Sequence, residues 1–115
     1  MERPLIEPQS LAKSCNEALI LACLEEGPRH GYQIALDIEE KGGGYFRFNH
    51  GTLYPILHKL EKEGLIKGAW SDEGPRGRRK SYGLTTKGRR YGVRLRAGWR
   101  EFIEHFLEVV EVDER

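Results

Sequence analysis

Apolar side chains recur at helical spacing in four stretches of this 115-residue chain, and two strand-like stretches lie between the third and the fourth. The first stretch, Ser10 to Glu26, begins at a potential N-cap serine. It is apolar nearly all round, so we expect a helix that is buried on several faces. The second stretch, about His30 to Lys41, directs one set of side chains inward: Tyr32, Ile34, Ala35 and Ile38. Breaks at Gly27-Pro28 and at residues 42–44 should end these two helices.

The third stretch, Asn49 to Leu65, predicts an amphipathic helix with a buried stripe of Leu53, Ile56, Leu57 and Leu60. We expect the Asn49 side chain to cap its N-terminus and Gly64 to end it in the left-handed conformation. Pro55 lacks a backbone donor and disfavours the helical region for Tyr54, so the helix either starts late or bends there. The remaining face carries hydrogen-bond donors that suit phosphates or bases: Thr52, Tyr54, His58 and Lys59.

Two short strands are expected next, at residues 65–69 and 80–84, around a turn-rich tip at residues 71–77. Three helices followed by a hairpin predict a winged helix-turn-helix, a mainly α (α+β) fold. Basic side chains that suit phosphate contact lie in this wing: Arg76, Arg78, Arg79 and Lys80.

A long final helix, capped by Thr85 or Thr86, should run to about Val112. Large apolar residues follow a heptad spacing along it, and one small domain cannot cover all of them. A second copy of the chain is therefore the expected partner, in a two-fold homodimer. The expected interface residues are Leu95, Trp99, Phe102, Ile103, Phe106, Val109 and Val110.

The formal net charge is only +1, but the charges are segregated along the chain. Between Glu73 and Glu101 there are ten Lys and Arg residues and no acidic residue, whereas the last fifteen residues hold six acidic residues and one arginine. Because local charge determines attraction to a polyanion, the basic segment is compatible with nucleic-acid binding.

Three runs of sequence resemble the PadR family of bacterial transcriptional regulators: GYQIALDIEE, GTLYPILHKLEKEGLI and RRKSYGLTTKGRR. The resemblance extends from about Leu19 to Arg90. It implies a winged helix-turn-helix, a dimer, and usually repression of a nearby promoter. The single C-terminal helix resembles that of the family's short subgroup. We accordingly divide the chain into a flexible lead-in (1–9), a DNA-binding domain (10–85) and a dimerisation helix (86–115).

The function expected from these features is a ligand-responsive, sequence-specific repressor that binds an inverted-repeat operator in double-stranded DNA as a homodimer. We expect Tyr32, Gln33, Thr52 and Tyr54 to contact the DNA backbone. His50, His58 and Lys59 are candidates for base edges or nearby phosphates. The alternative is a basic adaptor that binds protein or RNA. Protection of two half-sites separated by a helical turn would distinguish the repressor from the adaptor.

Trp99 suggests an effector site. Indole is too large to interdigitate easily across a two-fold axis, so two facing copies could form a slot for a planar aromatic molecule by stacking or cation–π attraction. A drug-binding short member of the family is similar in placing a Trp in this helix at the dimer centre. The alternative is that Trp99 simply packs in the interface.

Other function classes lack their signatures in this sequence. No hydrolase, metalloprotease or phosphate-loop motif occurs, and the four histidines are scattered, so we expect neither catalysis nor a metal or other cofactor. Cys15 and Cys23 are too far apart on one helix for a disulfide. No apolar run is long enough to cross a membrane and no leader is evident, so a cytoplasmic location is expected.

Overall fold

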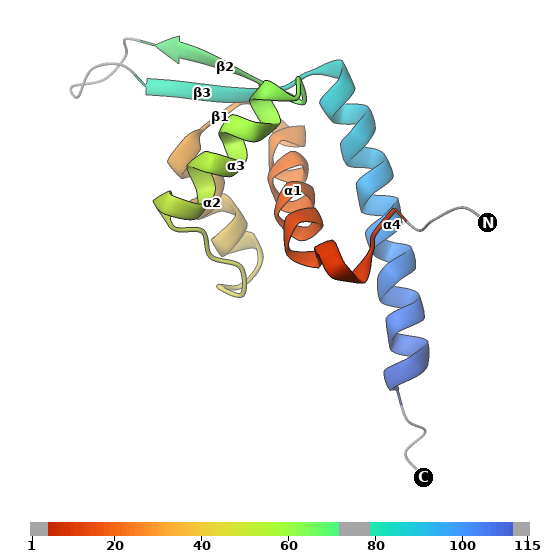
Figure 1. Ribbon diagram of the computed structural model, residues 1–115. Helices are drawn as coiled ribbons and strands as arrows, with labels where there is room; N and C mark the ends of the chain where they lie inside the picture. Colours follow the sequence, from red (N-terminus) through yellow and green to blue (C-terminus); the bar gives the residue numbers. More distant parts are fainter. Residues whose placement is uncertain (1–4, 72–78, 112–115) are drawn as a thin grey trace.

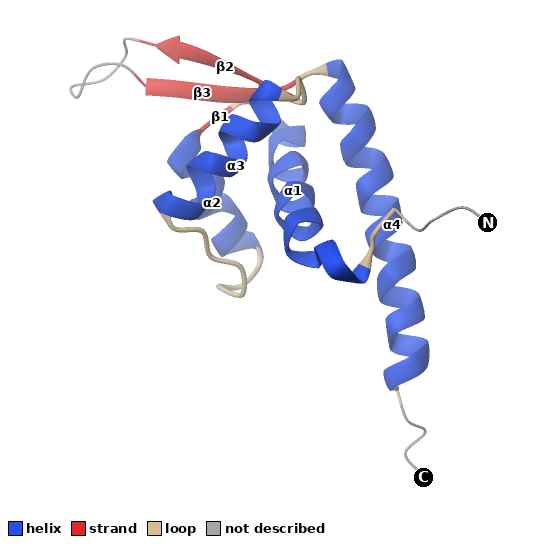
Figure 2. Cartoon of the chain, in the orientation of Figure 1, coloured by secondary structure: helices blue, strands red, loops and turns tan. Residues whose placement is uncertain are grey.

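The chain forms helices α1 to α4, two 3₁₀ turns and one small sheet in a computed structural model that describes residues 5–71 and 79–111 (Figure 1). The elements in chain order are η1 (Pro8–Ser10), α1 (Leu11–Cys23), η2 (Leu24–Glu26), β1 (Arg29–His30), α2 (Gly31–Lys41), α3 (His50–Lys62), β2 (Ile66–Ser71), β3 (Arg79–Leu84) and α4 (Thr86–Val110). The mainly helical winged fold expected from the sequence is confirmed (Figure 2).

The sheet is antiparallel, with strand order β1-β3-β2. In the hairpin, Ile66 pairs with Leu84 and Trp70 pairs with Lys80. β1 has only two residues and was not predicted, because so short a strand leaves no alternating pattern. Its pairing with β3 joins the start of α2 to the middle of β3, in the hairpin that projects from the helical body as the wing (Figure 1).

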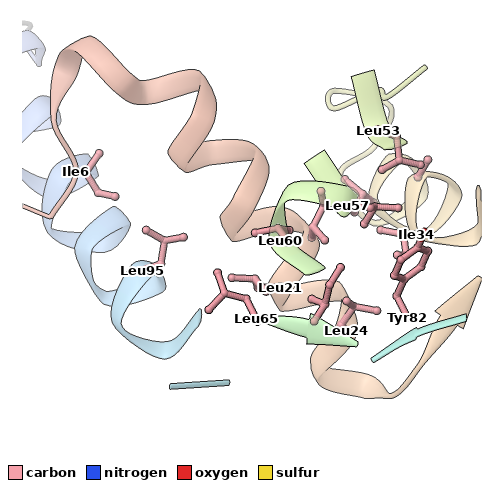
Figure 3. Close-up of a cluster of buried hydrophobic side chains, with 14 residues drawn as sticks. Ile6, Leu21, Leu24, Ile34, Leu53, Leu57, Leu60, Leu65, Tyr82 and Leu95 are labelled. Carbon is pink, nitrogen blue, oxygen red and sulfur yellow. The ribbon is translucent and has the colours of Figure 1, made fainter. Parts of the chain in front are cut away.

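One apolar core joins the helices to the sheet (Figure 3). α1 supplies Ile20 and Leu21, and the buried stripe of α3 supplies Leu53, Leu57 and Leu60 as predicted. Ile56 is only partly buried at its edge. Burial of each such side chain stabilises the fold by roughly 1.5–3 kcal/mol, so this stripe fixes which face of α3 remains exposed.

Helix ends follow the predicted capping at three of four positions. Asn49 Oδ1 accepts from the Thr52 amide at 2.9 Å, Thr85 caps α4 through the Gly88 amide, and Gly64 has φ +77°. Ser10 is an exception, because its side chain makes no capping bond. α3 begins at His50 and continues through Pro55, so a late start is excluded.

The packing anchors one residue of the expected lead-in and corrects another expectation. Ile6 is 2% exposed and packs in the core near Leu95 (Figure 3). Tyr32 was expected to point inward but is 49% exposed. It lies in the first turn of α2, where the helix end faces solvent and only the side chains from Ile34 onward reach the core.

α4 has two parts with different surroundings. In its first part Gly88, Gly92 and Leu95 are buried, and Gly88 lies against the Leu65 carbonyl so closely that an added Cβ would overlap the oxygen. Its last turns project beyond the helical body, and the side chains of Phe106, Val109 and Val110 are exposed there (Figure 1).

No helix in the described part of the chain is long and apolar enough to cross a membrane. A grouping of three or more potential metal ligands is likewise missing from residues 5–71 and 79–111.

Candidate nucleic-acid interface

The exposed face of α3 carries the predicted hydrogen-bonding side chains. Thr52, Tyr54, His58 and Lys59 are all exposed, because the opposite face is held in the core by the buried leucines. The Asn49 cap leaves the N-terminal end of α3 open to solvent, with His50 exposed in the first turn. Residues near the N-terminus of a recognition helix are the ones that reach base edges in the major groove.

An aromatic cluster joins the starts of α2 and α3. The His50 ring lies between those of Tyr32 and Tyr54, at centroid distances of 5.1 and 5.6 Å, with edge-on geometry to both. Such contacts orient the rings relative to one another. The structure therefore brings together three predicted DNA contacts from two helices.

Gly31 determines how closely Tyr54 approaches α2. A Cβ at position 31 would lie 2.8 Å from Tyr54 Cε1 and 3.0 Å from its hydroxyl oxygen. The hydroxyl consequently lies beside the first residue of α2, where unpaired backbone N–H groups and the positive end of the helix dipole favour anions. The sequence analysis did not identify Gly31, although a glycine at the start of a helix is a signal for close approach.

Gln33 is exposed on α2, but its side chain already has a partner. Its amide nitrogen donates to Asp37 Oδ1 at 2.7 Å, and Arg29 Nε donates to the other oxygen of that carboxylate at 3.1 Å. One N–H of the Gln33 amide is used in this bond, and the second can still donate to a phosphate.

In the wing, the structure separates Lys80 from the other predicted phosphate contacts. Arg79 is exposed, and Arg76 and Arg78 lie outside the described residues. Lys80 Nζ instead lies 2.8 Å from Glu61 Oε1 on α3. Because this ammonium is already paired with a carboxylate, a phosphate would have to share Lys80 with Glu61 or displace it, and the contact stays a prediction.

The ion pair shifts the pKa values of both its members. The hydrogen bond from Lys80 holds the pKa of Glu61 below its usual value, and the same bond raises the pKa of Lys80. Burial raises the pKa of the neighbouring Tyr82 hydroxyl. Glu61, another residue missed by sequence reasoning, is therefore an anion on the edge of the expected DNA-binding surface.

A separate apolar groove of about 480 Å³ runs between α1, the end of α2 and α4. Its lining includes both free cysteines, Phe46, Trp99 and Ile103. Trp99 packs edge-on against Phe102 at 5.4 Å, and its Nε1 is buried without a hydrogen-bond partner among the described residues. Burial raises the pKa of both thiols, which keeps them protonated near neutral pH.

Leu95 is the one predicted interface residue that the structure assigns elsewhere. It is 1% exposed inside the protomer core, so it has no surface left for a partner. Trp99 and Phe102 are half-buried against the core, and Ile103, Phe106, Val109 and Val110 are exposed. The apolar surface that continues from the groove therefore starts about one helical turn later than the heptad pattern indicated.

A three-helix body with an exposed helix face, followed by a β-hairpin wing, defines the winged helix-turn-helix class of DNA-binding folds. A family model described as "Transcriptional regulator PadR-like family" matches residues 20–109. The chain belongs to this family of transcriptional regulators, as its sequence motifs suggested.

Related proteins and solved structures agree with this assignment. An uncharacterized protein of Lysinibacillus sphaericus is 32% identical over 98 residues, covering 83% of this chain and 90% of the relative. The negative transcriptional regulator PadR of Bacillus subtilis is 34% identical over 70 residues, which cover 61% of this chain but only 38% of that longer protein. Among solved structures, a transcriptional regulator from Clostridium thermocellum has a TM-score of 0.80 at 27% identity, covering 89% of this chain and 99% of that one. A PadR family regulator from Clostridium difficile has a TM-score of 0.68 at 33% identity, covering 81% and 94%.

Proposed function

We propose that this chain is a repressor that binds an inverted-repeat operator as a homodimer. The observation that carries the proposal is the joint surface of α2 and α3, where Tyr32, His50 and Tyr54 form one exposed cluster. Thr52, His58 and Lys59 extend this surface along α3, and Arg79 extends it onto the wing. The similarity to the negative transcriptional regulator PadR of Bacillus subtilis supports repression.

Two kinds of contact are assigned to this surface. Tyr54 donates its hydroxyl to a phosphate beside the N-terminus of α2, with Tyr32 and Thr52 as further backbone contacts. His50, His58 and Lys59 face the groove, where they meet base edges or the phosphates that flank them. Gln33 adds a backbone contact through the second N–H of its side-chain amide, or through both N–H groups after release from Asp37.

The homodimer is proposed from the exposed apolar surface at the end of α4. Phe102 and Phe106 stack at 6.4 Å with nearly parallel rings, and Ile103 belongs both to this surface and to the groove. A second copy related by a two-fold axis would cover the exposed residues of both chains at once, because the same patch serves both partners. The interface then comprises Trp99, Phe102, Ile103, Phe106, Val109 and Val110.

Responsiveness to an aromatic effector is a further part of the proposal. The groove beside Trp99 is mostly apolar, and its lining holds two acids, Glu26 and Asp37, and two cations, Lys41 and Arg96. Stacking on the Trp99 ring, rather than net charge, would therefore hold a planar aromatic molecule there. Titration with planar aromatic compounds, in a Trp70→Phe background, should quench the fluorescence of Trp99 until the signal saturates. The same compounds should release the operator DNA. A ligand that binds without changing operator affinity would contradict its role as an effector, since equal affinity for both states shifts no equilibrium.

Footprinting on the DNA upstream of the chain's own gene tests the repressor proposal. We expect protection of two half-sites whose centres lie about one helical turn, or a multiple of it, apart. Lys59→Ala should weaken binding, and Lys13→Ala is the matched control because Lys13 is an exposed lysine on α1, outside the joint surface. Equal binding of any duplex, or preference for RNA, would instead support the basic adaptor.

A further inference from the structure

We infer that Glu61 and Lys80 are positioning residues for DNA binding: their ion pair ties the recognition helix α3 to the wing and fixes the angle between these two DNA-contacting elements. The inference rests on the proposed function and adds to it a role for an acidic residue, Glu61, at the edge of the expected DNA-binding surface. The pair is separated by nineteen positions in the sequence, and Lys80 Nζ lies 2.8 Å from Glu61 Oε1. Both side chains are partly shielded, with 24% and 30% of their surfaces exposed.

Glu61 contacts both strands of the wing. While Oε1 binds Lys80 of β3, Oε2 accepts a hydrogen bond from the Gly68 amide of β2 at 3.3 Å. A single carboxylate on α3 therefore holds the two strands from one side. Since these strands already pair with each other, the hairpin is attached as a unit and has little freedom to tilt.

The strand register explains why the Lys80 side chain lies on the face of the wing that is turned toward α3. Gly68 pairs with Tyr82 and Trp70 pairs with Lys80, so these four residues project from the same face of the hairpin. The Lys80 ammonium lies 5.6 Å from the Trp70 ring centroid and 5.3 Å from that of Tyr82. Two aromatic rings and one carboxylate thus lie beside the cation and compete with a phosphate for it.

Gly68 makes room for this arrangement. A Cβ at position 68 would overlap Lys80 Cε and lie 2.9 Å from Glu61 Oε2. Any other residue at this position would push the lysine stem and the carboxylate apart. The glycine is therefore part of the same arrangement that positions the wing.

Charge alone predicts the opposite result of removing Glu61. A carboxylate near a DNA-binding surface repels phosphates, so its neutralisation should strengthen DNA binding if Glu61 has no other role. If the pair sets the wing angle, neutralisation weakens operator binding instead. The sign of the change therefore separates positioning from simple electrostatics.

The test compares Glu61→Gln and Lys80→Met with the wild type and with Glu63→Gln, a matched loss of an exposed acid near the end of α3. Anisotropy titrations at several salt concentrations give the affinities for the operator and for a random duplex, and circular dichroism shows that each variant is folded. We expect both variants of the pair to lose about tenfold in operator affinity, a size typical of residues that act through a coupled element. The ratio of operator to random affinity should fall, while the salt slope stays unchanged. Glu63→Gln should bind as well as the wild type or better.

A charge exchange completes the test. Glu61→Lys combined with Lys80→Glu restores the attraction with its direction reversed, so it should recover much of the operator affinity that Glu61→Lys alone loses. Operator binding by Glu61→Gln at or above the wild-type level would overturn the inference. A salt slope lowered by about 0.9 in Lys80→Met would also overturn it, because such a change marks a lost phosphate contact. Wild-type protein that binds no inverted repeat would overturn the proposed function itself.

Discussion

The contact between Gly31 and Tyr54 allows the hydroxyl that we propose as a DNA contact to be moved without being removed. In Gly31→Ala, the new methyl group would lie 2.8 Å from Tyr54 Cε1. An ordinary contact is at least 3.4 Å, so the ring has to move by about 0.6 Å. The helix itself tolerates alanine, which has a higher helix propensity than glycine.

The expected loss of operator affinity follows from the hydrogen bond to phosphate that the movement of the Tyr54 ring disturbs. A bond between a hydroxyl and a charged phosphate contributes about 1.5–3 kcal/mol, and a displacement of this size should cost part of it. We expect operator affinity to fall by about 1–2 kcal/mol, or about 5- to 30-fold in Kd. The free energy of unfolding should change by less than about 1 kcal/mol, because helix propensity offsets the contact.

Fluorescence anisotropy on operator DNA, combined with urea denaturation, measures both quantities. Tyr54→Phe removes the hydroxyl altogether, so its loss of operator affinity is the largest that a disturbance of this hydrogen bond can produce. In the Tyr54→Phe background, Gly31→Ala should cost no further affinity, because both changes act on one bond. An equal additional loss in the double variant would show that Gly31 acts by another route. Unchanged binding by both single variants would remove Tyr54 from the DNA interface.

Four further predictions concern the dimer, the packing of α4, the response to pH and the wing. Phe106→Ala should dissociate the dimer at micromolar concentration in sedimentation, since truncating a buried Phe costs about 3–5 kcal/mol; a fully dimeric variant would move the interface elsewhere. Gly88→Ala should lower the free energy of unfolding, measured by urea denaturation, by about 2–5 kcal/mol. The added methyl group overlaps the Leu65 carbonyl and disturbs the hydrogen bond that this carbonyl accepts from the Thr85 amide. Gly51→Ala, the control, should be nearly neutral. Burial raises the pKa of Tyr91 to about 12. The stability that the protonated hydroxyl contributes should therefore be complete below about pH 10 and be lost as the pH rises toward 12. Urea denaturation at pH 9 and pH 11.5 should show that the difference in the free energy of unfolding between the wild type and Tyr91→Phe becomes smaller at the higher pH. Arg79→Ala should reduce the salt slope of operator binding by about 0.9, and an unchanged slope would exclude a phosphate contact at this residue.

Local pattern predicted the elements whose side chains alternate between core and solvent over several turns. The stripe of α3 identified both its buried leucines and its exposed hydrogen-bonding side chains, because a helix that buries one face must expose the other. The Asn49, Gly64 and Thr85 caps were predicted for a similar reason, since each depends only on residues within one turn.

Features that depend on distant partners were missed or misassigned. Lys80 belongs to a basic run, and only its distance from Glu61 across the α3–wing junction shows that its charge is paired. Leu95 fits the heptad spacing, but Ile6 and α1 bury it within its own chain. Spacing along one helix indicates that a residue faces an apolar partner, whereas it does not specify which chain provides that partner.

The packing of Gly88 against Leu65 has a mechanical consequence for the proposed dimer. It fixes the first turn of α4 to the residue that precedes β2, so the wing and α4 share one pivot. α4 has 25 residues and is therefore about 37 Å long. At that length, a rotation of about 5° at the pivot moves the far end of α4 by about 3 Å. A side-chain rearrangement of ångström size near Phe106 thus corresponds to a rotation of only a few degrees at the wing. α4 therefore converts a displacement at the proposed partner contact into a smaller displacement at the proposed DNA-binding surface.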